Sequence, residues 1–141
     1  MNGEEGLAPS SDKLVMIVDD DRDICDMLEF ILKREGFRTA MALDGKGCLE
    51  QVQADRPDLI ILDLMMPRHG GFEVLRSLQQ EGDTAKIPVI VITGRYTDRT
   101  TADMIHQEPN VVEFLEKPLN PQAMALTMHK LLKTSPLRDQ K

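Results

Sequence analysis

The sequence has few cysteines, no long apolar run and no excess of basic residues. Its two cysteines, Cys25 and Cys48, form neither a CxxC pair nor a Cys/His ligand pattern, which argues against a metal or redox centre. No apolar run approaches the roughly 18 residues of a membrane span, and residues 1–5 lack the features of a signal peptide. We therefore expect a cytoplasmic protein. The formal net charge of -7 argues against direct binding to nucleic acid or to an anionic membrane.

What is present is the composition of an ordinary globular domain. The 141 residues are 41% hydrophobic and 29% charged, enough for one domain that buries about two-thirds of its unfolded surface without a disulfide. Residues 1–12 are rich in Gly, Ser, Pro and acid, so we expect a disordered leader there. We expect the folded domain over residues 13–133 and a flexible tail over residues 134–141.

Short apolar segments alternate with helical patterns along the whole chain. The segment at 59–63 is too short, taken alone, to distinguish a buried strand from a piece of buried helix. The expected strands are residues 14–18, 37–42, 59–63, 88–93 and 111–116, and the expected helices are residues 22–35, 45–54, 71–82, 97–107 and 121–133. Strict strand–helix alternation predicts an α/β fold, a doubly wound parallel sheet with helices on both faces.

The apolar content of each strand predicts its place in the sheet. The first, third and fourth strands are apolar throughout, which is typical of strands buried on both faces. The second and fifth strands mix apolar and charged residues, so we expect them at the edges. The five-stranded order 2-1-3-4-5 satisfies both conditions, and in such sheets ligands bind at the carboxyl ends of the strands.

Polar side chains stand at the carboxyl ends of four of these strands. Asp19 and Asp20 follow the first strand, Asp63 ends the third, Thr93 ends the fourth and Lys117 follows the fifth. Each has an ordinary explanation by itself, such as a helix cap, a turn residue or a surface cation. Their joint placement at one edge of the sheet instead indicates a site.

The residue types of this set suit phosphoryl transfer. Three neighbouring carboxylates repel one another unless a cation joins them, and Mg²⁺ commonly binds one or two carboxylates together with water and phosphate oxygens. A carboxylate such as Asp63 can attack a phosphoryl group to form an aspartyl phosphate. The ammonium of Lys117 and the hydroxyl of Thr93 are donors suited to phosphoryl oxygens.

Four motifs at matching separations make the chain similar to a known family. The motifs are residues 18–21, residues 63–67 with Gly71 behind them, the pair Thr93-Gly94 and the pair Lys117-Pro118. Residues 13–133 resemble the receiver domain of two-component response regulators, in particular the single-domain regulators of chemotaxis. The resemblance implies a flavodoxin-like fold and a phosphoprotein that works in a phosphorelay.

The resemblance also implies roles for single residues. Asp63 would be the phosphoacceptor and would bind Mg²⁺ together with Asp20, Asp19 and the backbone carbonyl of Met65. A second group would contact the phosphoryl group and carry the switch. It consists of Thr93, Gly94, Lys117 and Phe114. The bond before Pro118 would be cis. An alternative for Phe114 is a core aromatic on an edge strand.

The function implied by the resemblance is a signalling switch that takes a phosphoryl group from a histidine kinase or a histidine phosphotransfer protein. The domain would catalyse its own aspartyl phosphorylation and slow autodephosphorylation, and would act on a downstream protein target through its fourth helix, fifth strand and last helix. One alternative is a pseudo-receiver that binds proteins without phosphorylation. Another is a small-molecule phosphatase, against which Met65 counts because such enzymes generally carry an acid at that position.

Two features depart from the family pattern. Residues 106–110, His-Gln-Glu-Pro-Asn, replace the small-residue turn that usually precedes the fifth strand. Met65 and Arg95 replace groups that help to place the hydrolytic water in fast-cycling members, and neither can act as a base. We therefore expect a long-lived phosphoryl state.

Overall fold

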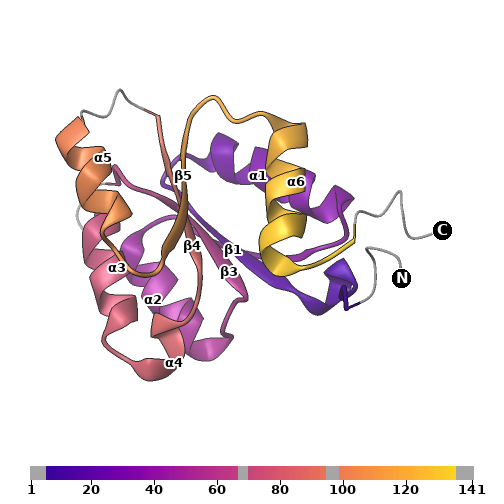
Figure 1. Ribbon diagram of the computed structural model, residues 1–141, viewed down its shortest axis with the longest axis horizontal. Coiled ribbons are helices and arrows are strands. Elements are labelled where there is room, and N and C mark those ends of the chain that lie inside the picture. The colour runs from indigo at the N-terminus through magenta and orange to yellow at the C-terminus, as the bar shows by residue number, and fades with distance from the viewer. Residues whose placement is uncertain (1–5, 67–69, 95–98, 136–141) are drawn as a thin grey trace.

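A computed structural model describes residues 6–66, 70–94 and 99–135, which form one parallel sheet between two layers of helices (Figure 1). The strands are β1 (Leu14–Val18), β2 (Arg38–Ala42), β3 (Leu59–Asp63), β4 (Val89–Thr93) and β5 (Val111–Glu116). All neighbouring strands are parallel, in the order β2-β1-β3-β4-β5. The predicted fold class, strand order and flavodoxin-like topology are confirmed.

Two separate apolar cores hold the helices against the sheet. The helices are α1 (Arg22–Arg34), α2 (Gly45–Ala54), α3 (Gly71–Gln79), α4 (Gly82–Ala85), α5 (Arg99–His106) and α6 (Pro121–Leu132). Side chains of α1 and α6 pack on one face of the sheet, and side chains of α2, α3 and α5 pack on the other (Figure 1). None of the described helices is long and apolar enough to cross a membrane.

Burial follows the apolar content of the strands. Every residue of β1, β3 and β4 is buried, whereas β2 is mostly half-buried and β5 has three exposed residues. The prediction of central and edge strands is therefore confirmed. In β5 a register shift places Val112 as an extra residue between Val111, paired with Val89, and Glu113, paired with Ile90.

Polar side chains cap the amino ends of α1 and α6, each of which begins soon after a strand. The carboxylate of Asp21 accepts a hydrogen bond from the Asp23 amide at the start of α1, and the amide oxygen of Asn120 does the same for Ala123 at the start of α6. Because these turns are short, the residues that precede each cap stay at the edge of the sheet. This arrangement positions Asp19 and Asp20 above β1.

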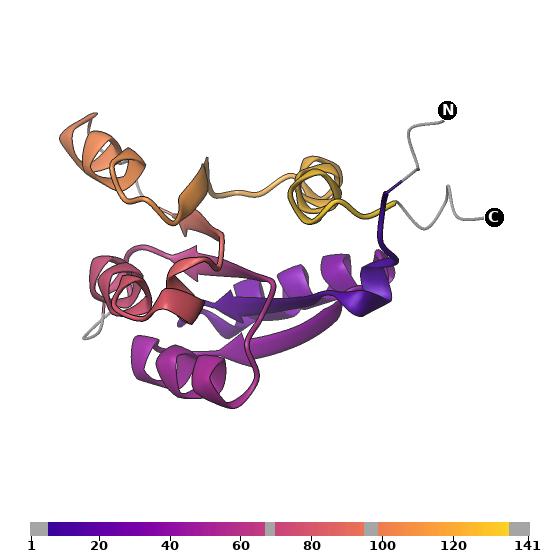
Figure 2. The ribbon, with the colours of Figure 1, turned by 60° about the horizontal axis from the view of Figure 1, so that its bottom comes forward.

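The segment before β1 and the segment after α6 differ from the prediction of a disordered leader and a flexible tail. Residues 10–12 form a 3₁₀ turn, and Ala8 forms a parallel bridge with Thr134 (Figure 2). The Ala8 amide donates to the Lys133 carbonyl at 2.9 Å, and the Ser10 side chain is buried. Polar composition predicted disorder because it ignores such tertiary pairing. Residues 1–5 and 136–141 lie outside the described part.

Some boundaries of the elements also differ. The helix expected over residues 71–82 ends at Gln79, and Gly82 instead begins the short α4. The buried Thr84 hydroxyl donates to the Leu78 carbonyl at 2.6 Å and so satisfies the end of α3. The second strand begins at Arg38, one residue later than expected. Of the helix expected over residues 97–107, the structure describes α5 from Arg99, and Arg95 lies outside the described residues.

Candidate functional site

A polar hollow lies at the carboxyl end of the sheet, between the ends of β1, β3, β4 and β5. Its volume is about 310 Å³. The lining residues are Asp19, Asp20, Asp21, Asp63, Met65, Gly94 and Lys117. Six of the site residues expected from the sequence therefore share this hollow, which lies where ligands bind in open α/β sheets.

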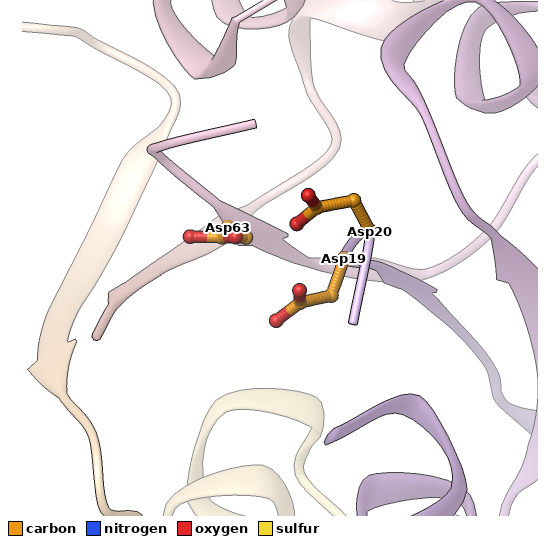
Figure 3. A group of neighbouring side chains, drawn as sticks. All are labelled: Asp19, Asp20 and Asp63. Carbon is orange, nitrogen blue, oxygen red and sulfur yellow. The ribbon is translucent and has the colours of Figure 1, made fainter. Parts of the chain in front are cut away.

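Three carboxylates meet in the hollow. Asp19 and Asp20 extend from the end of β1 toward the side on which Asp63 stands (Figure 3). One carboxylate oxygen from each lies within 4.8 Å of those of the other two. Asp19 is fully buried, Asp63 is 5% exposed and Asp20 is exposed. The Asp21 amide donates to Asp19 Oδ1 at 2.9 Å and holds that carboxylate in place.

Lys117 reaches into the same hollow from the end of β5. Its Nζ lies 2.8 Å from Asp19 Oδ2 and 3.9 Å from Asp63 Oδ2, so the ammonium is paired with Asp19 and stands near Asp63. Burial lowers the pKa of Lys117, but the hydrogen bond and charge of Asp19, together with the charges of the other two carboxylates nearby, Asp63 and Asp21, raise the pKa overall. The Lys117 amide donates to the Thr93 carbonyl at 2.7 Å, and the Lys117–Pro118 bond is cis, as expected.

Asp63 holds its proton more tightly than an ordinary aspartate. Its pKa is raised to about 6, first because the carboxyl is buried and second because Asp19 is close. The Met65 amide, which donates to Asp63 Oδ1 at 3.2 Å, and the Lys117 charge both act in the opposite direction. Mutual repulsion among oxygen ligands of this kind is relieved by a hard divalent cation, so the donor set fits Mg²⁺.

Two glycines leave room for this arrangement. A Cβ at Gly94 would stand 3.2 Å from Lys117 Cδ, so a side chain there would press on the lysine. A Cβ at Gly71 would stand 2.8 Å from Leu64 Cα, which leaves no space because backbone cannot yield easily. Gly71 thus allows α3 to start close behind Asp63.

Two of the expected site residues do not line the hollow. Thr93 is fully buried at the end of β4. Phe114 is half-buried and packs against the core between the sheet and α2, α3 and α5, with the His106 ring edge-on at 6.0 Å. The alternative expectation for Phe114, a core aromatic on an edge strand, describes this packing.

Asp21 and Cys25 belong to the surroundings of the site, a role that the sequence pattern did not predict for them. Asp21 both lines the hollow and caps α1, and its place in the run of three aspartates was the available signal. Cys25 Sγ donates to the Asp19 carbonyl at 3.3 Å. Burial raises the pKa of this thiol to about 11, so it remains protonated and serves as a donor.

Comparisons with known proteins agree with the fold and with the motifs. The family model described as the response regulator receiver domain matches residues 15–129. The response regulator MprA of Mycobacterium ulcerans is 34% identical over 125 residues, which cover 89% of this chain and 52% of that protein. MprA of Mycobacterium tuberculosis is 33% identical over the same length, covering 89% and 53%. The chain thus spans about half the length of the curated relatives it matches.

Solved structures show the same similarity. The chemotaxis response regulator CheY4 of Vibrio cholerae superposes with a TM-score of 0.76 at 27% identity, covering 85% of this chain and 98% of that one. A receiver domain of a signal transduction histidine kinase from Syntrophus aciditrophicus has a TM-score of 0.76 at 28% identity, covering 85% and 89%. Fold, family model and relatives agree, and the chain belongs to the response regulator receiver domains of two-component systems.

Proposed function

We propose that Asp63 accepts a phosphoryl group from the phosphohistidine of a histidine kinase or a histidine phosphotransfer protein. The observation that carries the proposal is the position of Asp63, which ends β3 inside a hollow that also holds two other carboxylates and Lys117. In the step, a carboxylate oxygen bonds to phosphorus while the P–N bond breaks, and the imidazole leaves with the electron pair.

The acidic residues would hold Mg²⁺ beside the acceptor. Asp20, Asp63 and the Met65 carbonyl are the candidate ligands, with Asp19 supporting them. The ion would supply positive charge to the phosphoryl oxygens as they approach the carboxylates. Asp19 also keeps Lys117 in the hollow through the 2.8 Å contact, so the lysine is positioned before a phosphoryl group arrives.

The remaining residues would convert the new charge into a change of surface. Lys117 Nζ, only 3.9 Å from Asp63 Oδ2, would pair with a phosphoryl oxygen. The Thr93 hydroxyl would turn toward the phosphoryl group, and Phe114 would move into the space beside β4. The surface formed by α5, β5 and α6 would then bind the downstream target differently.

The phosphoryl group would be long-lived, because the exposed side chain beside the acceptor cannot activate water. Met65 is 55% exposed at the rim of the hollow, and its thioether has no proton to exchange. A pseudo-receiver is the second candidate function. It is favoured by the burial of Thr93 and by the core packing of Phe114, since neither residue is among those that line the hollow.

One labelling experiment tests the proposal and separates the two candidates. The intact mass is measured after incubation with Mg²⁺ and a small acyl phosphate, and again with a phosphorylated histidine phosphotransfer protein. We expect one added phosphoryl group in the wild type and in Asp26→Asn, an exposed aspartate on α1, but none in Asp63→Asn. If neither donor labels the wild type, the pseudo-receiver is correct. Equal labelling of Asp63→Asn would refute the assignment of the acceptor.

A further inference from the structure

The loop between α5 and β5 is tied to α3 by a buried side chain. Asn110 is only 4% exposed although it lies in a loop. Its Nδ2 donates to the Leu75 carbonyl at 3.2 Å, and its Oδ1 accepts from Gln79 Nε2 at 2.8 Å. Both the nitrogen and the oxygen of the Asn110 side-chain amide are therefore bonded to α3.

Further contacts join the same loop to its neighbours. The Asn110 carbonyl accepts from the Val89 amide at 2.9 Å, which ties the loop to the start of β4. Arg76 Nε of α3 lies 3.3 Å from Glu108 Oε1. Arg76 is 65% exposed, so this ion pair is a weak contribution, and the buried Asn110 contacts are the stronger ones.

α5 itself is packed at its carboxyl end. Ile105 is fully buried in the core, whereas none of the side chains at residues 99–104 is buried. The last residue of the helix, His106, contacts the Phe114 ring. Figures 1 and 2 show α5 at the outer edge of the layer that also holds α3. The buried side chain of α5 thus lies at its carboxyl end, next to the loop that follows it.

We propose that α5 pivots about its carboxyl end, which the contacts of Asn110 hold in place. We call the pivoting helix the lever and Asn110 the pin. A shift of the whole helix would pull Asn110 out of its bonds and leave its buried side-chain amide without partners, a costly outcome for a polar group. A rotation about Ile105 displaces the exposed amino-terminal turns and keeps those bonds. The pin is a property of the resting protein, and only its use in signalling rests on the proposed function.

The lever predicts where a phosphorylated surface changes. The amino-terminal turns of α5 would change their position, while His106 and the start of β5 would stay with α3. A downstream partner that responds to the phosphorylated state would therefore read the amino-terminal turn that begins with Arg99 and Thr100, which are both exposed. This location follows because Asn110 holds the carboxyl end of α5 in place, which leaves the amino-terminal end as the part that moves.

Hydrogen exchange followed by mass spectrometry tests the pin in the resting protein. Three amides report on the loop: those of Gln107 and Glu108 donate to carbonyls at the end of α5, and that of Val111 donates to the Glu108 carbonyl. In Asn110→Ala we expect residues 106–111 to exchange about tenfold faster, the factor that corresponds to losing roughly one buried hydrogen bond. The matched control is Gln107→Ala, which removes an exposed amide side chain from the same loop and should leave the rates within about twofold.

A second variant covers the case in which Asn110→Ala unfolds. Gln79→Met keeps the volume on α3 but removes the donor to Asn110 Oδ1, and should accelerate the same amides by a smaller factor. If residues 106–111 exchange at the wild-type rate in both variants, there is no pin. The same samples are then labelled with Mg²⁺ and an acyl phosphate.

Labelling separates the pin from the proposed function. In labelled wild type, exchange should change over residues 99–104 and stay unchanged over residues 106–111, and in Asn110→Ala the change should extend through both segments. An equal change along both segments of the wild type would overturn the lever. If the mass shows no added phosphoryl group, the proposed function fails, and the comparison of unlabelled variants still decides whether Asn110 is a pin.

Discussion

Removing the charge of Asp63 should stabilise the protein when no divalent cation is present. In the folded protein this carboxylate is buried beside Asp19, and both conditions oppose its ionisation. Asn has nearly the same size and keeps an oxygen for the Met65 amide, which donates at 3.2 Å. Asp63→Asn therefore relieves the unfavourable burial and repulsion while the packing is preserved.

The size of the effect follows from the pKa. Folding raises the Asp63 pKa from an ordinary 3.8 to about 6. Because one pKa unit corresponds to about 1.4 kcal/mol, ionised Asp63 lowers the free energy of unfolding by about 3 kcal/mol near neutral pH. The folded state binds the proton more tightly, so stability falls as pH rises from 3.8 to about 6 and stays low above it. The advantage of Asp63→Asn should shrink to about 1 kcal/mol near pH 4.5.

Urea denaturation in EDTA at these two pH values measures the difference. Asp26→Asn is the control, because this aspartate is exposed and its loss should change stability by less than about 0.5 kcal/mol. Added Mg²⁺ should stabilise the wild type by mass action and should have a much smaller effect on Asp63→Asn. A variant that is equally stable or less stable than the wild type near neutral pH would refute the reasoning about burial and repulsion.

Three other substitutions, two beside the site and one near the segment before β1, can be tested by the same denaturation assay. Gly71→Ala should cost about 2 kcal/mol or more, because its Cβ would stand 2.8 Å from Leu64 Cα, while Gly70→Ala, with its nearest contact at 3.8 Å, should be nearly neutral. Lys117→Met should cost about 2 kcal/mol in EDTA, because a fully buried carboxylate loses its 2.8 Å partner, and Mg²⁺ should restore part of the loss. The His129 ring bonds the Thr134 hydroxyl at 2.7 Å and the Glu35 carboxylate at 2.8 Å, so His129→Ala should cost about 2 kcal/mol and speed hydrogen exchange around Ala8, which is bridged to Thr134; unchanged exchange there would contradict these contacts.

Local sequence patterns predicted most of the fold because its causes are local. Apolar runs at 14–18 and 59–63 require burial on both faces, and charged residues in 111–116 exclude it, so the strand order follows. The site followed from the same reasoning, because parallel strands end at one edge and bring Asp19, Asp63 and Lys117 together. The boundary of α3 was less accessible, since the buried Thr84 bond that accompanies its end depends on how α4 folds back.

The sequence by itself determined the helices and strands, the order of the strands and the chemical groups that gather at one edge of the sheet. The spacing of apolar residues, the apolar content and the chain direction are all properties of short segments. Only the tertiary structure decided which groups pair. It placed Lys117 closer to Asp19 than to Asp63, buried Thr93, packed Phe114 in the core, and joined Ala8 to Thr134. It also buried Asn110 against α3. These contacts join segments that are distant in the chain, so their geometry depends on how the packed helices meet and on which polar groups are left to satisfy one another.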